Sequence, residues 1–113
     1  MHEIGVVRAM IKTVDDFCEQ NGIDEVCEIV LDIGELSLVI PKYVTEVYPS
    51  VVADTKYRDT QLVINEIPGL AQCDECDEIF NVIEHNGYCP ACGSFDKTVL
   101  TGESFSIREI HVK

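Results

Sequence analysis

The sequence predicts an α+β fold, in which two helices pack on a small mixed β-sheet and a four-cysteine module is inserted into the chain. Three observations support this. Two segments repeat apolar side chains at helical spacing, others alternate in polarity as strands do, and two Cys-x2-Cys pairs lie close together. We expect an α/β domain from residues 1–68 and 102–113, interrupted by a cysteine module from residues 69–101.

The first helix is expected to run from residue 4 to about residue 20. Asn21-Gly22 then supplies a helix stop. The second helix should begin at Pro41, because proline is tolerated at the first helical position, and should kink or restart at Pro49. The apolar stripe of the first helix, at intervals of three and four, is Ile4, Val7, Met10/Ile11, Val14 and Phe17/Cys18.

A half-buried strand is predicted for "EVCEIVLDIG", where Glu28 and Asp32 alternate with four apolar positions: Cys27, Ile29, Leu31 and Ile33. Because Cys27 lies on this apolar face and Cys18 on the helix stripe, we expect both thiols to be buried in the core rather than to bind metal. "TQLVINEIPG" predicts another strand, closed by Pro68-Gly69.

The tail "SFSIREIHVK" predicts a last strand with a β-bulge. Its apolar residues are out of phase, with Phe105 and Ile107 in one register and Ile110 and Val112 one position out of step. One extra residue near Arg108-Glu109 would restore a common face. We expect this strand to return to the first sheet, which makes the cysteine module an insertion rather than an appendage.

Composition limits the classes of function. The 113 residues include 46% apolar ones, enough for a core, and carry a net charge of −13. Between Arg58 and Lys97 there is neither lysine nor arginine, so nucleic-acid binding, which depends on cations, is not expected. A basic protein partner or attraction for cations fits this charge better, although solubility alone explains it about equally well.

The opening of the chain favours a cytoplasmic protein. No stretch approaches the roughly 18 uninterrupted apolar residues of a membrane span. Charges at Glu3, Arg8 and Lys12 also interrupt any secretory signal. Thiols stay reduced in the cytoplasm, so paired cysteines there usually indicate metal rather than disulfides.

The paired cysteines form the strongest motif, two Cys-x2-Cys turns separated by twelve residues. Two such turns can complete a sulfur tetrahedron, and Pro90 and Gly93 favour the tight turn that this requires. Four protein ligands leave no open position, so a zinc ion there would be structural and the module would resemble a zinc ribbon. Iron in a rubredoxin-like electron carrier is the alternative. The predicted ligands are Cys73, Cys76, Cys89 and Cys92.

The first residues offer a second metal site of different character. The α-amine of Met1, the amide nitrogen of His2 and its ring can chelate one ion, with Glu3 as a further donor. Nitrogen donors in tetragonal geometry favour Ni(II) or Cu(II). Such an exposed site suits a carrier of exchangeable metal. We expect His85 to be a solvated loop residue, with a role as second-site ligand less favoured, and His111 to be structural.

Three motifs resemble the HypA/HybF hydrogenase nickel-insertion proteins over essentially the whole chain: Met1-His2-Glu3, "DIGELSLVIP", and "C-x2-C" followed by "CPACGS". The resemblance implies a nickel metallochaperone for [NiFe] hydrogenase maturation. It carries nickel binding to Met1, His2 and Glu3, and zinc binding to the four cysteines. Some family members use a histidine near the zinc module as an extra nickel ligand, for which His85 is the candidate here.

The partners that the resemblance implies are a nickel-handling maturation GTPase and the hydrogenase large subunit precursor, with urease as an additional client. The oligomeric state stays open, a homodimer included. We do not expect an enzyme, because the sequence shows no convincing nucleophile–base pair or phosphate-binding glycine loop. The alternatives are a zinc-ribbon interaction module without nickel and the rubredoxin-like carrier.

Overall fold

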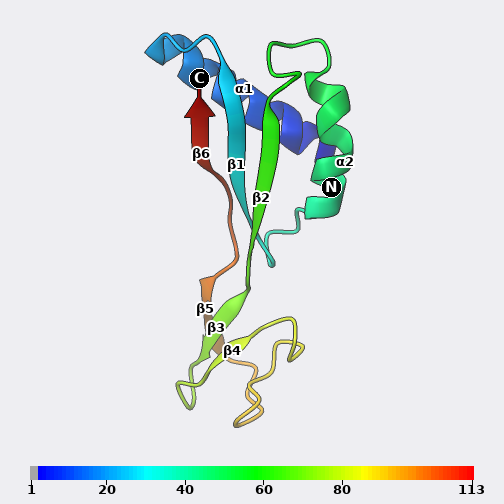
Figure 1. Cartoon of the computed structure of the whole chain (residues 1–113). Helices are drawn as coiled ribbons and strands as arrows, with labels where there is room; N and C mark the ends of the chain where they lie inside the picture. Colours follow the sequence, from blue (N-terminus) through cyan, green and yellow to red (C-terminus); the bar gives the residue numbers. More distant parts are fainter. Residues whose placement is uncertain (1–2) are drawn as a thin grey trace.

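The computed structural model describes residues 3–113, which form two helices and six strands in two separate sheets (Figure 1). The first sheet has the order β2-β1-β6 and the second the order β4-β3-β5. The elements are α1 (Glu3–Asn21), β1 (Val26–Gly34), α2 (Pro41–Val52), β2 (Gln61–Ile67), β3 (Leu70–Cys73), β4 (Ile79–Asn81), β5 (Lys97–Thr101) and β6 (Phe105–Val112).

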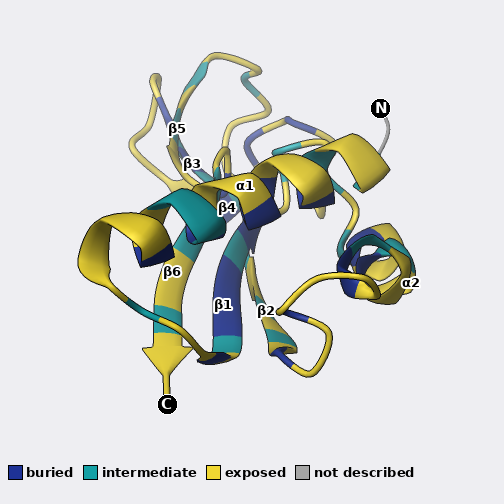
Figure 2. Ribbon diagram, turned by 90° about the horizontal axis from the view of Figure 1, so that it is seen from above, coloured by how far each residue is buried: buried dark blue, intermediate teal, exposed yellow. Residues whose placement is uncertain are grey.

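The first sheet is mixed, as predicted. Strand β1 runs parallel to β2 and antiparallel to β6. A parallel pair needs a long crossover connection, and the segment containing α2 supplies it. Viewed from above, α1 crosses over the sheet while α2 lies beside it (Figure 2). Together they enclose a core that includes Val7, Val14, Ile29, Leu31, Ile33 and Val44, each at most 1% exposed.

The predicted bulge in the last strand is confirmed. Val30 pairs with Glu109, but the next residue, Leu31, pairs with Ile107, so Arg108 is the extra residue. The bulge brings Ile107 and Ile110 onto the same core. Because β6 pairs with β1, the chain enters the second sheet from β2 and returns to the first, as an inserted module requires.

The prediction for Cys18 is confirmed, since its side chain is fully buried in this core. The prediction for Cys27 is wrong, because its side chain is exposed. The pairing of β1 with β6 shifts register between Val26 and Glu28, and this irregularity interrupts the alternation at Cys27. Val26 takes the buried position instead.

The end of α1 and the start of α2 follow from local chemistry. Helix α1 ends at Asn21, Gly22 adopts φ +64°, and the N–H of Ile23 bonds to the carbonyl of Cys18 at 2.9 Å. Helix α2 starts at Pro41, as predicted, and continues through Pro49 without a restart. Its buried side chains are Val44, Tyr48 and Val52.

The second sheet has only a small core of its own: Ala71, Cys73, Phe80 and Cys89. The whole molecule is elongated, with extents of 53 × 26 × 16 Å and a radius of gyration of 17.4 Å. A compact chain of this length would have a radius of gyration of about 13 Å. The molecule therefore has two lobes, each built around one sheet. Neither described helix is long and apolar enough to cross a membrane.

Three glycines, Gly34, Gly69 and Gly102, form what we call the glycine junction between the lobes. A Cβ on Gly34 would clash with the carbonyl oxygen of Gly102, and a Cβ on Gly102 would lie 2.6 Å from the Cα of Gly69. Backbone hydrogen bonds join the same segments. One of them runs from the N–H of Leu36 to the carbonyl of Gly102, at 2.7 Å. The absence of side chains lets three backbone segments approach closely enough to bond.

Candidate metal centre

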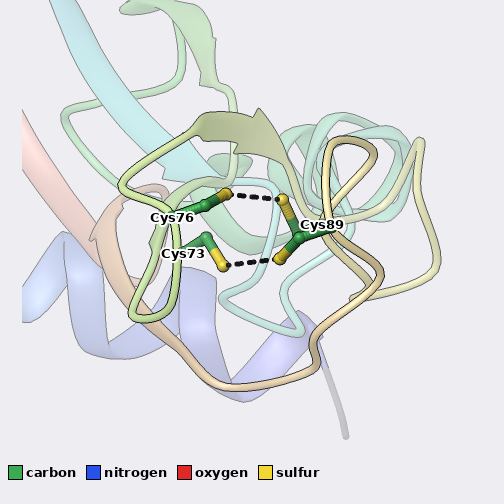
Figure 3. A group of neighbouring side chains, drawn as sticks. Cys73, Cys76 and Cys89 are labelled. Carbon is green, nitrogen blue, oxygen red and sulfur yellow. Dashed lines mark hydrogen bonds between the residues drawn. The ribbon is translucent and has the colours of Figure 1, made fainter.

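The four predicted cysteine ligands lie together in the second lobe. Their Sγ atoms are all within 4.8 Å of one another, and the pairs Cys73–Cys92 and Cys76–Cys89 are each 3.5 Å apart. The facing thiols of Cys73, Cys76 and Cys89 are seen in Figure 3. A tetrahedron with metal–sulfur bonds of about 2.3 Å has edges of about 3.8 Å. The cluster therefore fits one tetrahedral thiolate-bound ion.

The two Cys-x2-Cys turns have the same backbone form. In each, the residue after the second cysteine donates its N–H to the carbonyl of the first: Asp77 to Cys73 at 3.0 Å, and Gly93 to Cys89 at 2.8 Å. Both donor residues have positive φ, +64° at Asp77 and +78° at Gly93. The tight turn expected at Gly93 is confirmed, and aspartate, which tolerates positive φ better than most residues, fills the matching position in the other turn.

Burial divides the cluster into an inner and an outer half. Cys73, at the end of β3, and Cys89 are buried and pack with Phe80 in the small core. Cys76 and Cys92 are exposed. An ion held by all four would thus link the core of the module to its surface loops, and the four thiolates would fill every position of a tetrahedron.

Hydrogen bonding separates the thiol pKa values of the metal-free cluster. Burial raises the pKa of Cys89, but bonds from the backbone N–H groups of Cys92 and Ala91 and from Cys76 bring it down to about 7. For Cys76, the backbone of Glu78 lowers the pKa, the thiol of Cys89 raises it, and the outcome is about 12. A binding cation must displace the remaining thiol protons, so metal affinity falls with acid.

The predicted nickel ligands are only partly described. Glu3 is the first residue of α1, where a carboxylate interacts favourably with the positive end of the helix dipole. Met1 and His2 lie outside the described residues. The N-terminal end of α1 lies near α2 in both views, in the lobe of the first sheet and away from the cysteine lobe (Figures 1 and 2).

The two remaining histidines are not part of the cysteine cluster. His85 is exposed and meets the ring of Phe80 edge-on, with 6.2 Å between centroids. His111 lies on β6 with its Nε2 3.5 Å from Glu109 and 3.9 Å from Glu28. The partner Glu28 comes from β1, so spacing along the chain could not reveal it. Within residues 3–113, the four cysteines are the one group whose ligand atoms gather closely enough for a metal ion.

Comparison with known proteins identifies the family. A family model described as "Hydrogenase/urease nickel incorporation, metallochaperone, hypA" matches residues 1–112. The chain belongs to the HypA family. Among HypA relatives, the hydrogenase maturation factor HypA of Geobacter metallireducens is 31% identical over the full length of both chains. The factor of the same name from Nostoc sp. is 33% identical over all of this chain and 96% of its own.

Two solved HypA structures share the fold. The solution structure of the Ni metallochaperone HypA from Helicobacter pylori has a TM-score of 0.69 and 20% identity, covering 99% of this chain and 97% of that one. A second HypA solution structure, 21% identical, has the same TM-score and covers 100% and 97%. The predicted arrangement of two helices with a zinc-ribbon-like module is thus confirmed as a HypA fold.

Family membership decides between the functions left open by the sequence. The chain is a HypA nickel metallochaperone of hydrogenase maturation, with a four-cysteine metal site. It is a carrier of metal and not an enzyme. The rubredoxin-like electron carrier and the ribbon module without nickel are therefore set aside.

Proposed function

We propose that Met1, His2 and Glu3 hold the Ni(II) that this HypA protein carries. The observation that supports the proposal is the Met-His-Glu opening on a chain whose nickel-incorporation family model matches from residue 1 to residue 112. The α-amine, the His2 amide nitrogen and the imidazole can close adjoining chelate rings, and such nitrogen donors suit Ni(II). The ordinary pKa values of the amine and imidazole, about 8 and 6.5, mean that binding weakens with acid.

The position of Glu3 supports a site that can release its cargo. Glu3 begins α1, so its backbone is set by the helix while its side chain lies at the helix entrance. The donors proposed before it are the α-amine of Met1 and the amide and ring nitrogens of His2, which adjoin along the chain. A receiving protein can replace such donors one at a time, which a transfer site requires and a permanent site does not.

We propose further that Cys73, Cys76, Cys89 and Cys92 hold structural Zn(II). The closed sulfur geometry supports this, because all four positions of a tetrahedron are filled by protein. Residues 69–101 then act as the zinc-binding module, and residues 1–68 with 102–113 as the nickel-binding domain. Two sites are needed because a stable fold and a transferable ion place opposite demands on the ligands.

The partners proposed are the nickel-handling maturation GTPase and the hydrogenase large subunit precursor, with urease as a further client and a homodimer as the assembly to be tested. The support is family membership, since the family model names hydrogenase and urease nickel incorporation. We place the protein in the cytoplasm, because the cysteine ligands must stay reduced to bind metal.

Nickel titration of untagged, zinc-loaded protein tests the terminal site. We expect His2→Ala to weaken Ni(II) binding at least about tenfold, because a chelate ring is lost. His111→Ala is the matched control, since it removes an imidazole of β6 that already lies beside two carboxylates, Glu28 of β1 and Glu109 of β6. It should leave nickel affinity within about twofold. An N-terminal tag that keeps every side chain should weaken binding as His2→Ala does.

Two results would contradict the proposal. Equal nickel affinity and stoichiometry in wild type and His2→Ala would remove the imidazole from the ligand set. Unchanged affinity in the tagged protein would remove the α-amine. Calorimetry gives the affinities, and metal analysis before the titration establishes that the cysteine site is loaded throughout.

A further inference from the structure

The cysteine lobe exposes more large apolar side chains than its size requires. Five of them are between 48% and 57% exposed: Ile79, Ile83, Tyr88, Phe95 and Leu100. Beside Phe95 the surface is hollowed by a cavity of about 590 Å³, which we call the module hollow. It is lined by Asp74, Glu75, Phe95, Asp96, Lys97 and Val99. Neither metal site accounts for this surface.

Phe95 already binds a cation of its own chain. The Nζ of Lys97 lies 3.4 Å from the centroid of the Phe95 ring and donates a hydrogen bond to the Phe95 carbonyl at 3.0 Å. Tyr88 supports the ring edge-on, with 5.1 Å between centroids. The ring face is thus oriented by a neighbour and used as a cation–π acceptor, while 57% of Phe95 stays open to solvent.

Charge makes the hollow selective for cationic groups. Asp74, Glu75 and Asp96 line it, and all three are exposed. Residues 69–101 carry six carboxylates against one lysine, a net charge of −5. Four thiolates around one divalent ion add about two further negative charges. Two apolar side chains, Phe95 and Val99, line the hollow together with these three carboxylates and Lys97. This lining fits a side chain with an apolar stem and a cationic head, which describes arginine and lysine.

We propose that the module hollow is a docking site for a basic segment of a partner protein, with the stem of an arginine or lysine side chain against Val99 and the part of Phe95 that Lys97 leaves exposed, and its charge among the carboxylates. This inference goes beyond nickel carriage and does not depend on where nickel binds. A second copy of this chain is a poor occupant, because each copy carries −13 and the two repel. Nucleic acid and anionic lipid are repelled in the same way.

The neighbouring strand makes an extended segment the best-fitting shape. Strand β5, which contributes Lys97 and Val99 to the hollow, is an outer strand of the order β4-β3-β5. An outer strand can accept backbone hydrogen bonds from an added strand, whose alternate side chains then face one surface. Basic residues at every second position of the partner would therefore point toward the hollow.

The test uses the peptide Ac-Arg-Leu-Arg-Leu-Arg-NH2 as probe, with zinc-loaded, nickel-free protein and amide chemical shifts as the readout. Shifts are expected to concentrate at residues 74–75 and 95–99. The acidic counterpart Ac-Glu-Leu-Glu-Leu-Glu-NH2 should cause none. Because nickel is absent from this experiment, a negative peptide result would not bear on the proposed terminal nickel site. A negative nickel titration would likewise not bear on the docking site.

Two charge-matched double variants separate the hollow from bulk charge. E75Q/D96N removes exposed carboxylates at the hollow, whereas E46Q/D54N removes two exposed ones from the other lobe. We expect the first double variant to weaken binding of the basic peptide about tenfold and the second to weaken it less than about twofold. Carboxylates beside the bound peptide contribute more to its affinity than distant charges that salt screens. Phe95→Ala should also weaken binding about tenfold by removing apolar surface beside the carboxylates.

Zinc content must equal that of wild type in each variant, which shows that the module is folded. Equal weakening by both double variants would overturn the proposal by showing attraction to net charge alone. Shifts centred outside the hollow, or no binding at millimolar peptide, would also overturn it.

Discussion

At the residue scale, the same backbone requirement is met by different residues in the two cysteine turns. Gly93 and Asp77 occupy equivalent positions and both have positive φ. A Cβ built on Gly93 meets nothing within 4 Å, so only the backbone conformation restricts this position. The glycine is thus required by its φ angle and not by lack of space.

This requirement gives a prediction for the zinc-loaded protein. Gly93→Ala should lower the free energy of unfolding by about 1–2 kcal/mol, the usual cost of a left-handed alanine. Asp77→Gly should change the free energy of unfolding by less than about 0.5 kcal/mol. Glycine adopts positive φ without strain, but it also raises the conformational entropy of the unfolded chain, and the two effects oppose each other. Thermal unfolding and zinc competition with a chelator measure both changes. A Gly93→Ala protein as stable as wild type would contradict the argument.

At the element scale, buried hydroxyl groups connect α2 and the loop after it to their neighbours. Tyr48 of α2 donates its hydroxyl to the Thr60 carbonyl at 2.9 Å, and Thr60 donates to the Val26 carbonyl at 2.7 Å. Tyr57 donates to Asp15 of α1 at 2.7 Å. Burial raises the pKa of both tyrosines, that of Tyr48 to about 12. These bonds fix the loop between α2 and β2 against α1 and β1.

The raised pKa of Tyr48 predicts how stability changes in alkali. Its ordinary pKa is 10.0 and its folded value is about 12, so the neutral hydroxyl contributes fully below about pH 10 and is lost as the pH rises through about 12. Urea unfolding across this pH range should show that the free energy of unfolding falls less steeply with pH in Tyr48→Phe than in wild type. Parallel declines would show that Tyr48 does not contribute to the alkaline loss.

At the scale of the whole molecule, close backbone packing joins two lobes that have separate cores. The glycine junction is reinforced by Glu35, whose Oε1 accepts hydrogen bonds from the Gly69 N–H at 2.9 Å and from the Asn81 side chain at 3.1 Å. Asn81 belongs to β4, so one carboxylate contacts both the connection and the module. The position of the four-cysteine cluster relative to Glu3 at the start of α1, next to which we propose nickel binding, therefore depends on this small region.

Alanine substitutions test the junction. Gly34→Ala should lower the free energy of unfolding by about 1–3 kcal/mol, because its Cβ would force backbone segments apart. Gly5→Ala is the control: a Cβ there meets nothing within 4 Å, and helical alanine should stabilise α1 by about 0.5 kcal/mol. Denaturant unfolding gives both values. A tolerated Gly34→Ala would mean that the junction can spread without cost.

Metal removal tests the independence of the lobes. A strong chelator should unfold residues 69–101, whose core holds few residues, and leave the β2-β1-β6 lobe folded with its helices. Far-UV circular dichroism should keep its helical signal while amide dispersion is lost in the module. Purified protein should contain one zinc per chain and be colourless. Cooperative loss of α1 on chelation, or a red protein rich in iron, would contradict these expectations.

The sequence by itself determined the elements of the first lobe and the chemistry of the cysteine cluster, because both depend on local order. Residue periodicity indicated both helices, the three strands of the first sheet and the bulge at Arg108, and cysteine spacing indicated the sulfur cluster. The three strands of the second sheet were not predicted. Only the tertiary structure decided what depends on strand pairing and packing between distant segments. It exposed Cys27 through a register shift, gave His111 its carboxylate neighbours, and brought Phe95 together with Asp74 and Glu75 in one hollow. The physical reason is that such contacts join residues far apart in the chain, and no local pattern records them.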